Sequence, residues 1–359
     1  MADDDWTTIR EVKQAANGRF AVRSQVEAVR ERVTKTGKPF LEIGLRDAED
    51  SLTLKVWEDN PVFPMASSLK TGNFIEVVGD WTTGNYGLEC KDWGLSLLDE
   101  AEIAAVLHGS ESLRQKQEED WDDIAGFVAG MVDPRLRTLC QWFLDDYGER
   151  FRRTAAARDY HHARRGGLVE HVAQMMRTAD AICGVYPILN RDLVLAGVLF
   201  HDCGKLWENS FPENGFVMPV QEAGEMLGHI TIGLELINRL WRDLMQNEEA
   251  EEWKSLEPAN EHVRIHLLHL VASHHGEYEF GSPVLPRTPE AMVLHHVDNI
   301  DAKLEMMFRG YETSPEVGRN VLERVRPLPA RLVKPLAHFH FKPADPESGE
   351  QDGDEEGKV

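Results

Sequence analysis

The sequence predicts a protein of two folded parts, an all-β domain followed by an all-α domain, with an acidic tail at its end. Residues 18–98 contain short stretches in which apolar and polar side chains alternate, as they do in half-buried strands. From Trp121 to about Arg309 apolar residues recur at helical spacing instead, and strand signals are absent. The chain has 359 residues, which is long enough to bury two cores.

Five strands are expected in the first part. The longest alternating stretch runs from Phe20 to Val33, and turn residues follow it at 36–38. A short helix is expected between Pro61 and Leu69. The remaining strands are expected over residues 40–46, 52–57, 73–79 and 87–97. Five strands with a helix after the third match the order of an OB barrel, although other small β domains share the strand count.

The second part is expected to be a bundle of helices whose ends and inner faces carry histidine and aspartate. His171 lies early in one amphipathic stretch, and the apolar run 193–200 ends at His201 and Asp202. Further positions of this kind are His229 at a helix start, His274 and His275 at a helix end, and Asp298 within a helix. Helix ends and inward faces meet readily in one core cavity of a bundle.

Composition narrows the class of protein. No run of 18 apolar residues occurs and the N-terminus lacks an apolar signal segment, so we expect no membrane span. The four cysteines lack CxxC spacing and are expected to be reduced thiols in a cytoplasmic protein. The net charge is −23, partly from seven carboxylates between Asp345 and Glu356. A site for polyanions must therefore be local or built from metal ions.

Histidine is the most informative residue type. Twelve of the fifteen histidines lie between His161 and His296, which indicates metal or acid–base chemistry. An apolar helix that ends in His201 and Asp202 would bury a carboxylate at high cost, and a divalent metal removes that cost. Mixed imidazole and carboxylate ligands favour Mn, Fe, Co, Ni or Zn over Mg or Ca alone. Six or seven candidate ligands suggest two ions, with one ion and outer histidines as the alternative.

Several residues are candidates for substrate contacts. Lys205 stands three residues after Asp202, where it would reach a phosphate oxygen, unless it is an ordinary surface lysine. His161 and His162 precede a helix and are candidates for touching substrate. One basic cluster is either a rim that follows phosphates or a solvated helix face, and it consists of Arg150, Arg152, Arg153, Arg158, Arg164 and Arg165. Base-stacking candidates, most of them expected in the barrel core, are Phe40, Trp57, Trp81, Tyr86 and Trp93.

Other residues of the same types are expected to be structural. This group of packing or surface histidines consists of His262, His266 and His269. Only one of His295 and His296 can share the inward helix face with Asp298. Asp301 either orients a ligand histidine or pairs with Lys303, and Cys203 is expected to be a small core residue.

The pattern His171, His201-Asp202 and Asp298 resembles the HD superfamily of metal-dependent phosphohydrolases. Two longer stretches are similar to the YhaM-type 3′→5′ exoribonucleases: residues 161–171, and residues 273–291 followed by 296–303. That family carries an OB-fold domain before its HD domain, and residues 37–47 resemble its barrel. The resemblance covers roughly residues 15–310.

The resemblance implies an activity and a site. The activity is metal-dependent removal of nucleotides from the 3′ end of single-stranded RNA, typically with Mn, and single-stranded DNA is a further candidate substrate. The implied metal ligands are His171, His201, Asp202, His229, His274, His275 and Asp298. The expected catalytic residues are His201, Asp202 and Lys205. The expected substrate-binding residues are Lys205, His161, His162, Arg164 and Arg165.

These interpretations divide the chain into segments. We expect an OB-fold nucleic-acid-binding domain at 15–99, a linker at 100–123, an HD domain at 124–310, a C-terminal extension at 311–342 and a disordered acidic tail at 343–359. A homo-oligomer remains open. Two alternative functions also remain open: a phosphohydrolase for small nucleotides, and a non-catalytic RNA-binding protein whose metal site is structural.

Overall fold

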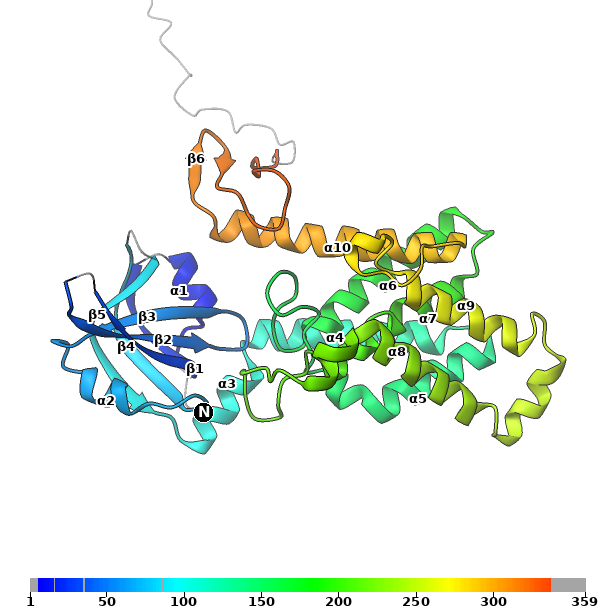
Figure 1. The fold of residues 1–359 in the computed structure, drawn as a ribbon, viewed down its shortest axis with the longest axis horizontal. Helices are drawn as coiled ribbons and strands as arrows, with labels where there is room; N and C mark the ends of the chain where they lie inside the picture. The colour runs from blue at the N-terminus through cyan, green and yellow to red at the C-terminus, as the bar shows by residue number, and fades with distance from the viewer. Residues whose placement is uncertain (1–5, 16, 35, 85–86, 337–359) are drawn as a thin grey trace, which may run out of the picture.

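A sheet of strands and a bundle of helices make up the fold. The computed structural model describes residues 6–15, 17–34, 36–84 and 87–336, so the expected acidic tail at 343–359 lies outside the described residues. Figure 1 shows the strands gathered at one end of the molecule and the helices beside them. The predicted fold class, an N-terminal all-β part followed by an all-α part, is confirmed.

The N-terminal part is a five-stranded antiparallel sheet with the order β3-β2-β1-β4-β5. Its strands are β1 (Asn17–Val33), β2 (Pro39–Arg46), β3 (Ser51–Trp57), β4 (Phe74–Gly84) and β5 (Gly87–Leu97). The short helix α2 (Phe63–Ser68) lies between β3 and β4, as the sequence predicts. The two edge strands β3 and β5 contact each other, so the sheet curls into the partly open barrel expected of an OB fold.

Alternation along the strands builds the barrel core. In β2 the side chains of Leu41, Ile43 and Leu45 are buried while their neighbours are only partly so. The helix α1 (Ile9–Ala15), which the sequence did not predict, packs Ile9 and Val12 into this core. The backbone N–H of Ile9 donates to Asp47 Oδ2 at 2.6 Å, which ties the helix start to the β2–β3 turn.

The rest of the described chain is mainly helical. Its helices are α3 (Glu100–His108), α4 (Glu111–Ala129), α5 (Pro134–Phe151), α6 (Gly167–Val185), α7 (Arg191–Phe200), η1 (Cys203–Trp207), α8 (Glu222–Leu244), η2 (Glu248–Ser255), α9 (Asn260–Ser273), η3 (Tyr278–Phe280) and α10 (Pro289–Thr313). A two-stranded hairpin, β6 (Glu316–Gly318) and β7 (Val321–Leu322), follows the last helix. Among the described residues no helix is long and apolar enough to cross a membrane.

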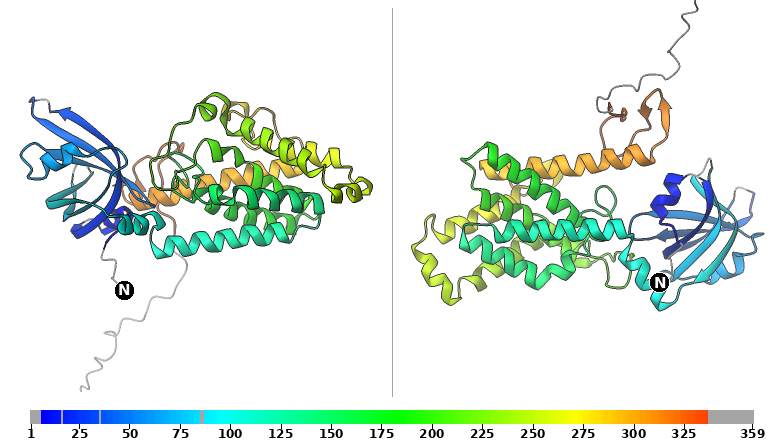
Figure 2. Two further views of the ribbon diagram at one scale, coloured as in Figure 1. Left: turned by 90° about the horizontal axis from the view of Figure 1, so that it is seen from below. Right: turned by 180° about the vertical axis from the view of Figure 1, so that it is seen from behind.

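Helix α7 is the centre of the bundle. Every residue from Asp192 to Phe200 is buried, and α7 contacts α5, α6, α9 and α10. The two views of Figure 2 show these helices wrapped around one another, with α10 running along one side of the bundle. A helix that is apolar all round must end inside the protein, so the residues that follow Phe200 begin in the interior.

Contacts between the barrel and the bundle are both apolar and polar. Phe74 of β4 packs edge to face against Phe216, with ring centroids 6.1 Å apart. The side-chain carbonyl of Gln25 in β1 accepts hydrogen bonds from the backbone N–H groups of Phe216 (2.6 Å) and Val217 (3.2 Å). Arg309 of α10 pairs with Asp50 of the β2–β3 turn at 3.2 Å. Helix α4 begins in the segment expected to be a linker and packs on α6, so the chain between the two parts is helical and docked.

Candidate metal centre

Backbone geometry brings His201, Asp202 and His229 together. His201 caps the C-terminus of α7 and Asp202 follows it at the start of η1. Gly228 has φ 69° and ψ 158° and interrupts α8, so His229 opens the second part of that helix. Gly204 lies so close to this point that a Cβ there would stand 1.9 Å from the carbonyl oxygen of His229. Only glycine therefore allows η1 and α8 to meet.

One half of the cluster is formed by side chains of α6, α7 and α10. The Nε2 atom of His171 lies 3.3 Å from His201 Nε2 and 3.4 Å from Asp298 Oδ1. His201 Nε2 in turn lies 3.1 Å from Asp202 Oδ2. His171 and His201 are fully buried, so the sequence prediction that these positions converge holds for this half.

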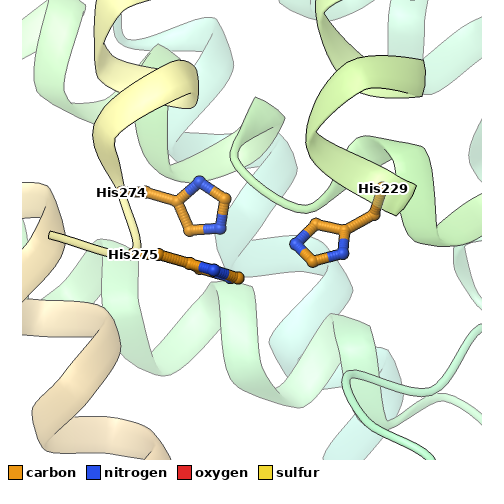
Figure 3. A group of neighbouring side chains, drawn as sticks. All are labelled: His229, His274 and His275. Carbon is orange, nitrogen blue, oxygen red and sulfur yellow. The ribbon is translucent and has the colours of Figure 1, made fainter. Parts of the chain in front are cut away.

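The other half is formed around the second oxygen of Asp202. Its Oδ1 atom lies 3.4 Å from His229 Nε2 and 3.7 Å from His274 Nε2. The rings of His274 and His275 are 4.4 Å apart between centroids, and that of His275 is 5.2 Å from His229. Figure 3 shows the three rings turned toward one another from the end of α9 and from α8. Asp202 thus joins the two halves.

The outer nitrogen of each imidazole in the cluster has an acceptor. The Nδ1 atoms of His201 and His274 donate to the carbonyl oxygens three residues earlier, each at 2.7 Å. The other pairs are His171 Nδ1 with Asp301 Oδ2 (2.7 Å), His275 Nδ1 with the Phe280 carbonyl (2.6 Å) and His229 Nδ1 with Glu208 Oε2 (3.1 Å). Because these acceptors take the Nδ1 protons, it is the Nε2 atom of each ring that faces inward.

This donor set fits divalent metal ions. Buried atoms without a hydrogen-bond partner include Asp202 Oδ1, His229 Nε2 and His274 Nε2, three atoms that face the same space. The Nε2 atoms of His171 and His201 lie 3.3 Å apart, beside the carboxylates of Asp298 and Asp202. Imidazole nitrogens and carboxylate oxygens are ligands of Mn, Fe, Co, Ni and Zn. The arrangement therefore supports a divalent metal as the cofactor.

The protonation states of most of these groups suit metal binding. Burial opposes ionisation of Asp202, but His201 and Lys205 hold the pKa of its carboxyl well below its usual range. Burial lowers the pKa of His274 and of His275. His171 differs, because hydrogen bonds to Asp298 and Asp301 outweigh burial and raise its pKa to about 9. A metal ion at His171 therefore displaces a proton.

A buried network holds His171 from behind. Asp301 Oδ2 accepts from His171 Nδ1 and also from His162 Nε2 at 3.0 Å. On the far side of His162 lies Glu170, which is fully buried and accepts from Arg164 at 2.9 and 2.5 Å. Lys116 and Gln117 of α4 reach the same carboxylate at 3.2 and 3.0 Å. Asp301 thus has the orienting position that was one of its two sequence interpretations.

Two of the expected substrate-binding residues lie beside the cluster. Lys205 Nζ lies 2.6 Å from Asp202 Oδ2 and is almost buried. The ring of His161 is 5.5 Å from that of His171, its Nδ1 has no partner, and burial lowers its pKa to about 3. The His161 imidazole is therefore neutral and available for hydrogen bonding.

The other expected substrate-binding residues have different neighbours. His162 and Arg164 belong to the network behind His171, and Arg165 donates to the carbonyl oxygens of Pro212 and Glu213. Their contact with substrate remains a prediction.

The remaining arginines of the basic cluster do not gather at the His and Asp cluster. Arg152 and Arg153 line a cavity of about 800 Å³ that also contains glutamates and none of the seven expected ligands.

The structure also separates the remaining histidines. His295 Nδ1 hydrogen-bonds to the carbonyl of His274 at 2.8 Å, while His296 is exposed. Cys203 is fully buried, as expected of a core residue. Glu208, which accepts from His229, was missed by the sequence analysis because nothing in its local pattern sets it apart from a surface glutamate.

The bundle with its His and Asp cluster defines a class of protein, the metal-dependent HD-domain hydrolases. Residues 168–303 match the family model of the HD domain. Over 287 residues the chain is 31% identical to the 3′-5′ exoribonuclease YhaM of Geobacillus sp. (strain WCH70), and the match covers 80% of this chain and 83% of that protein. The chain belongs to the family of YhaM 3′-5′ exoribonucleases.

Proposed function

We propose that this enzyme removes nucleotides one at a time from the 3′ end of single-stranded RNA, with Mn as the working metal. The observation that carries the proposal is the convergence of the His and Asp side chains, with inward Nε2 atoms and the unpartnered Asp202 Oδ1. The relative that covers most of the chain bears the name of a 3′-5′ exoribonuclease, which supports RNA as the substrate. Single-stranded DNA remains a second candidate.

Different residues of the chain would hold the cations and offset the charge on the phosphate. His171, His201 and Asp298 would hold one cation, and Asp202, His229, His274 and His275 a second, with Asp202 shared. Divalent cations supply Lewis-acid chemistry, activating water and neutralising phosphate charge. Lys205, already paired with Asp202, would offset the charge that develops on the phosphate oxygens. A water oxygen would bond to phosphorus as the bond between phosphorus and the preceding 3′ oxygen breaks. That oxygen would take up a proton, and a nucleoside 5′-monophosphate would leave.

The barrel would bind RNA, and the helical part would hydrolyse it. We assign residues 15–99 to RNA binding and 124–310 to hydrolysis, as the sequence analysis expects. His161, neutral and unpartnered beside His171, is the best placed of the expected substrate contacts. A cytoplasmic location is in keeping with free thiols at all four cysteines. Light scattering would measure whether the chain forms a homo-oligomer.

A labelled-substrate assay tests the proposal. Purified protein is incubated with 5′-labelled single-stranded RNA and Mn, and the products are resolved over time. We expect a ladder that shortens from the 3′ end and is absent with Asp202→Ala. Intact RNA under Mn, Co, Ni, Zn and Mg alike would refute the proposal.

The main rival is hydrolysis of small nucleotides by the same cluster. It shares the metal chemistry, but it leaves no role for a separate barrel. Turnover of mononucleotides and of a 30-nucleotide RNA is compared on one enzyme preparation. Faster turnover of the mononucleotide would favour the rival.

A further inference from the structure

One segment next to the metal centre holds aromatic side chains that the proposed chemistry does not use. It joins α9 to α10, begins directly after His275 and consists of residues 276–288, and we call it the η3 loop. In this loop Tyr278 is 60% exposed and Phe280 is 61% exposed. Two aromatic rings therefore offer apolar surface to solvent within five residues of an expected metal ligand.

The backbone of the η3 loop is fixed against the metal centre. The carbonyl oxygen of Phe280 accepts from His275 Nδ1 at 2.6 Å, and Figure 3 shows the His275 ring turned toward the other histidines of its half of the cluster. Ser282 is buried, and its hydroxyl lies 3.3 Å from the carbonyl oxygen of Ala272 and 2.7 Å from that of Val284. Because the contact with His275 is made by a backbone atom, Phe280 lies beside the cluster whatever its side chain does.

The aromatic side chains of the barrel are placed differently. Trp81 is 0% exposed and Trp93 is 8% exposed, so both belong to the barrel core. Phe40 and Trp57 pack against each other with ring centroids 4.9 Å apart, and Tyr86 lies outside the described residues. None of these described barrel residues contacts a member of the metal cluster, whereas the η3 loop does, so its rings are placed to meet the reacting end of a substrate.

The charges of the η3 loop determine which part of an RNA fits against it. Glu277 and Glu279 are exposed, and among the described residues neither forms an ion pair. The single cation of the loop, Arg287, lies near the start of α10, where its backbone N–H donates to His269 Nε2 at 3.0 Å. Upstream nucleotides each bring a phosphate, which the two carboxylates repel. A terminal nucleoside with a free 3′-hydroxyl brings no phosphate beyond the scissile one, so it is the part that fits.

We infer that the η3 loop receives the 3′-terminal nucleoside of the RNA substrate, whose base stacks on Phe280 and Tyr278. The inference rests on the proposed function and gives the strand a direction. The scissile phosphate lies at the cluster, the nucleoside to be released lies beside His275, and the rest of the strand runs away from the loop. Stacking accepts any base, because every base has an aromatic face. The carboxylates of the loop disfavour RNA that ends in a 3′-phosphate.

Binding of the reaction product tests the stacking without turnover. Calorimetry in the presence of Mn compares a nucleoside 5′-monophosphate with ribose 5-phosphate, which lacks the base. We expect Phe280→Ala to weaken binding of the nucleoside monophosphate about tenfold, the loss of one stacked base. Its affinity for ribose 5-phosphate should equal that of wild type, because the carbonyl that holds His275 remains. Phe280→Tyr should bind both ligands as wild type does, because a ring is retained.

Cleavage tests the role of the carboxylates. The kcat/KM is measured for one trinucleotide with a 3′-hydroxyl and for the same trinucleotide with a 3′-phosphate. We expect wild type to prefer the 3′-hydroxyl end. The double variant Glu277→Gln with Glu279→Gln should reduce that preference about three- to tenfold, because the repulsion of the added phosphate is removed.

Controls separate the inference from the proposed function. Tyr186→Ala removes an exposed aromatic at the C-terminus of α6 and should leave both comparisons unchanged. Circular dichroism and a thermal melt check that each variant folds. If wild type shortens neither trinucleotide, the proposed function is wrong and the inference with it. If wild type shortens them and Phe280→Ala binds both ligands as wild type does, or weakens both equally, the η3 loop does not hold the terminal base.

A second exposed aromatic gives the sharpest contrary outcome. Tyr160 is 50% exposed and directly precedes His161, which lies beside His171 in the other half of the cluster. A loss confined to the nucleoside monophosphate in Tyr160→Ala, with no such loss in Phe280→Ala, would place the terminal nucleoside on that side and overturn the inference.

Discussion

The metal cluster and the aromatic pair of Phe40 and Trp57 on the barrel hold their side chains in opposite ways. In the cluster, His171, His201 and His274 are buried, and a hydrogen bond at Nδ1 fixes the orientation of each ring. On the barrel, Trp57 is half exposed and packs against Phe40. The first arrangement determines geometry at atomic precision, as hydrolytic chemistry requires. The second leaves an aromatic surface open to solvent.

This difference predicts unequal sensitivity to substitution. Small changes within the cluster should abolish turnover, because a ligand displaced by an ångström no longer serves the reaction. Removal of a whole aromatic ring from the barrel should reduce affinity for long RNA only.

Asp202→Asn should have the largest effect. Asp202 lies between the two halves of the cluster and pairs with Lys205, and an amide in its place removes the negative charge that both halves face. We expect kcat to fall by roughly 10³-fold or more. Single-turnover cleavage of 5′-labelled RNA measures the loss, with calorimetry of Mn binding alongside. Activity within tenfold of wild type would mean that the reaction does not depend on this carboxylate.

Gly204→Ala should also be severe, although it removes no functional group. The added Cβ would stand 1.9 Å from the His229 carbonyl, so η1 and α8 must separate and carry Asp202 away from His229. We expect a loss of about 100-fold in kcat in folded protein. Gly184→Ala is the matched control, because a Cβ at that position of α6 meets nothing within 4 Å. Equal activity of the two variants would contradict the close approach.

Asp301→Asn tests the network behind His171. The amide oxygen can accept from His171 or from His162 but loses the charge that serves both. We expect Mn affinity to weaken by about 10- to 100-fold, the usual effect of losing an outer partner of a metal-ligating histidine. Calorimetry of Mn binding is the readout, and the exposed neighbour Lys303→Gln is the control. Unchanged affinity would show that Asp301 does not position His171.

Gln25→Ala should have the smallest effect on turnover. Its side chain accepts two backbone hydrogen bonds from Phe216 and Val217 at the contact between barrel and bundle. Their loss should lower the free energy of unfolding by about 1–3 kcal/mol. Urea denaturation measures the change, and cleavage of a trinucleotide is expected to change little. A large loss of trinucleotide cleavage would mean that the barrel acts on the chemistry itself.

The parts of the fold and of the site that could be predicted are those that leave a regular pattern in the sequence. The five strands, α2 and the placement of His171, His201, Asp202 and Asp298 follow from alternation and helical periodicity, because those patterns record which face is buried. The helix α1 was missed because it is short, and its position depends on Asp47 far along the chain. The partners Glu208 and Glu170 were missed for the same reason, since long-range hydrogen bonds leave no local pattern.

The sequence could not predict the partners and the exposure of single side chains in the arginine cluster and among the barrel aromatics. Spacing alone cannot distinguish Arg164, which pairs with buried Glu170, from an arginine that faces phosphate. Similarly, Trp57 and Trp81 lie in similar alternating strands, and only the barrel's curvature decides that Trp81 is enclosed. Exposure of a single side chain depends on tertiary packing, which short-range patterns do not encode.

Anomalous X-ray diffraction from crystals soaked in Mn²⁺ tests the metal centre most directly. We predict one peak within ligand distance of His171, His201 and Asp298, and a second beside Asp202, His229 and His274, with Asp202 between them. A single peak touching Asp202 would reduce the centre to one ion with outer histidines. No peak in the cluster, under conditions in which Mn²⁺ supports RNA cleavage, would contradict the account and place the chemistry elsewhere in the chain.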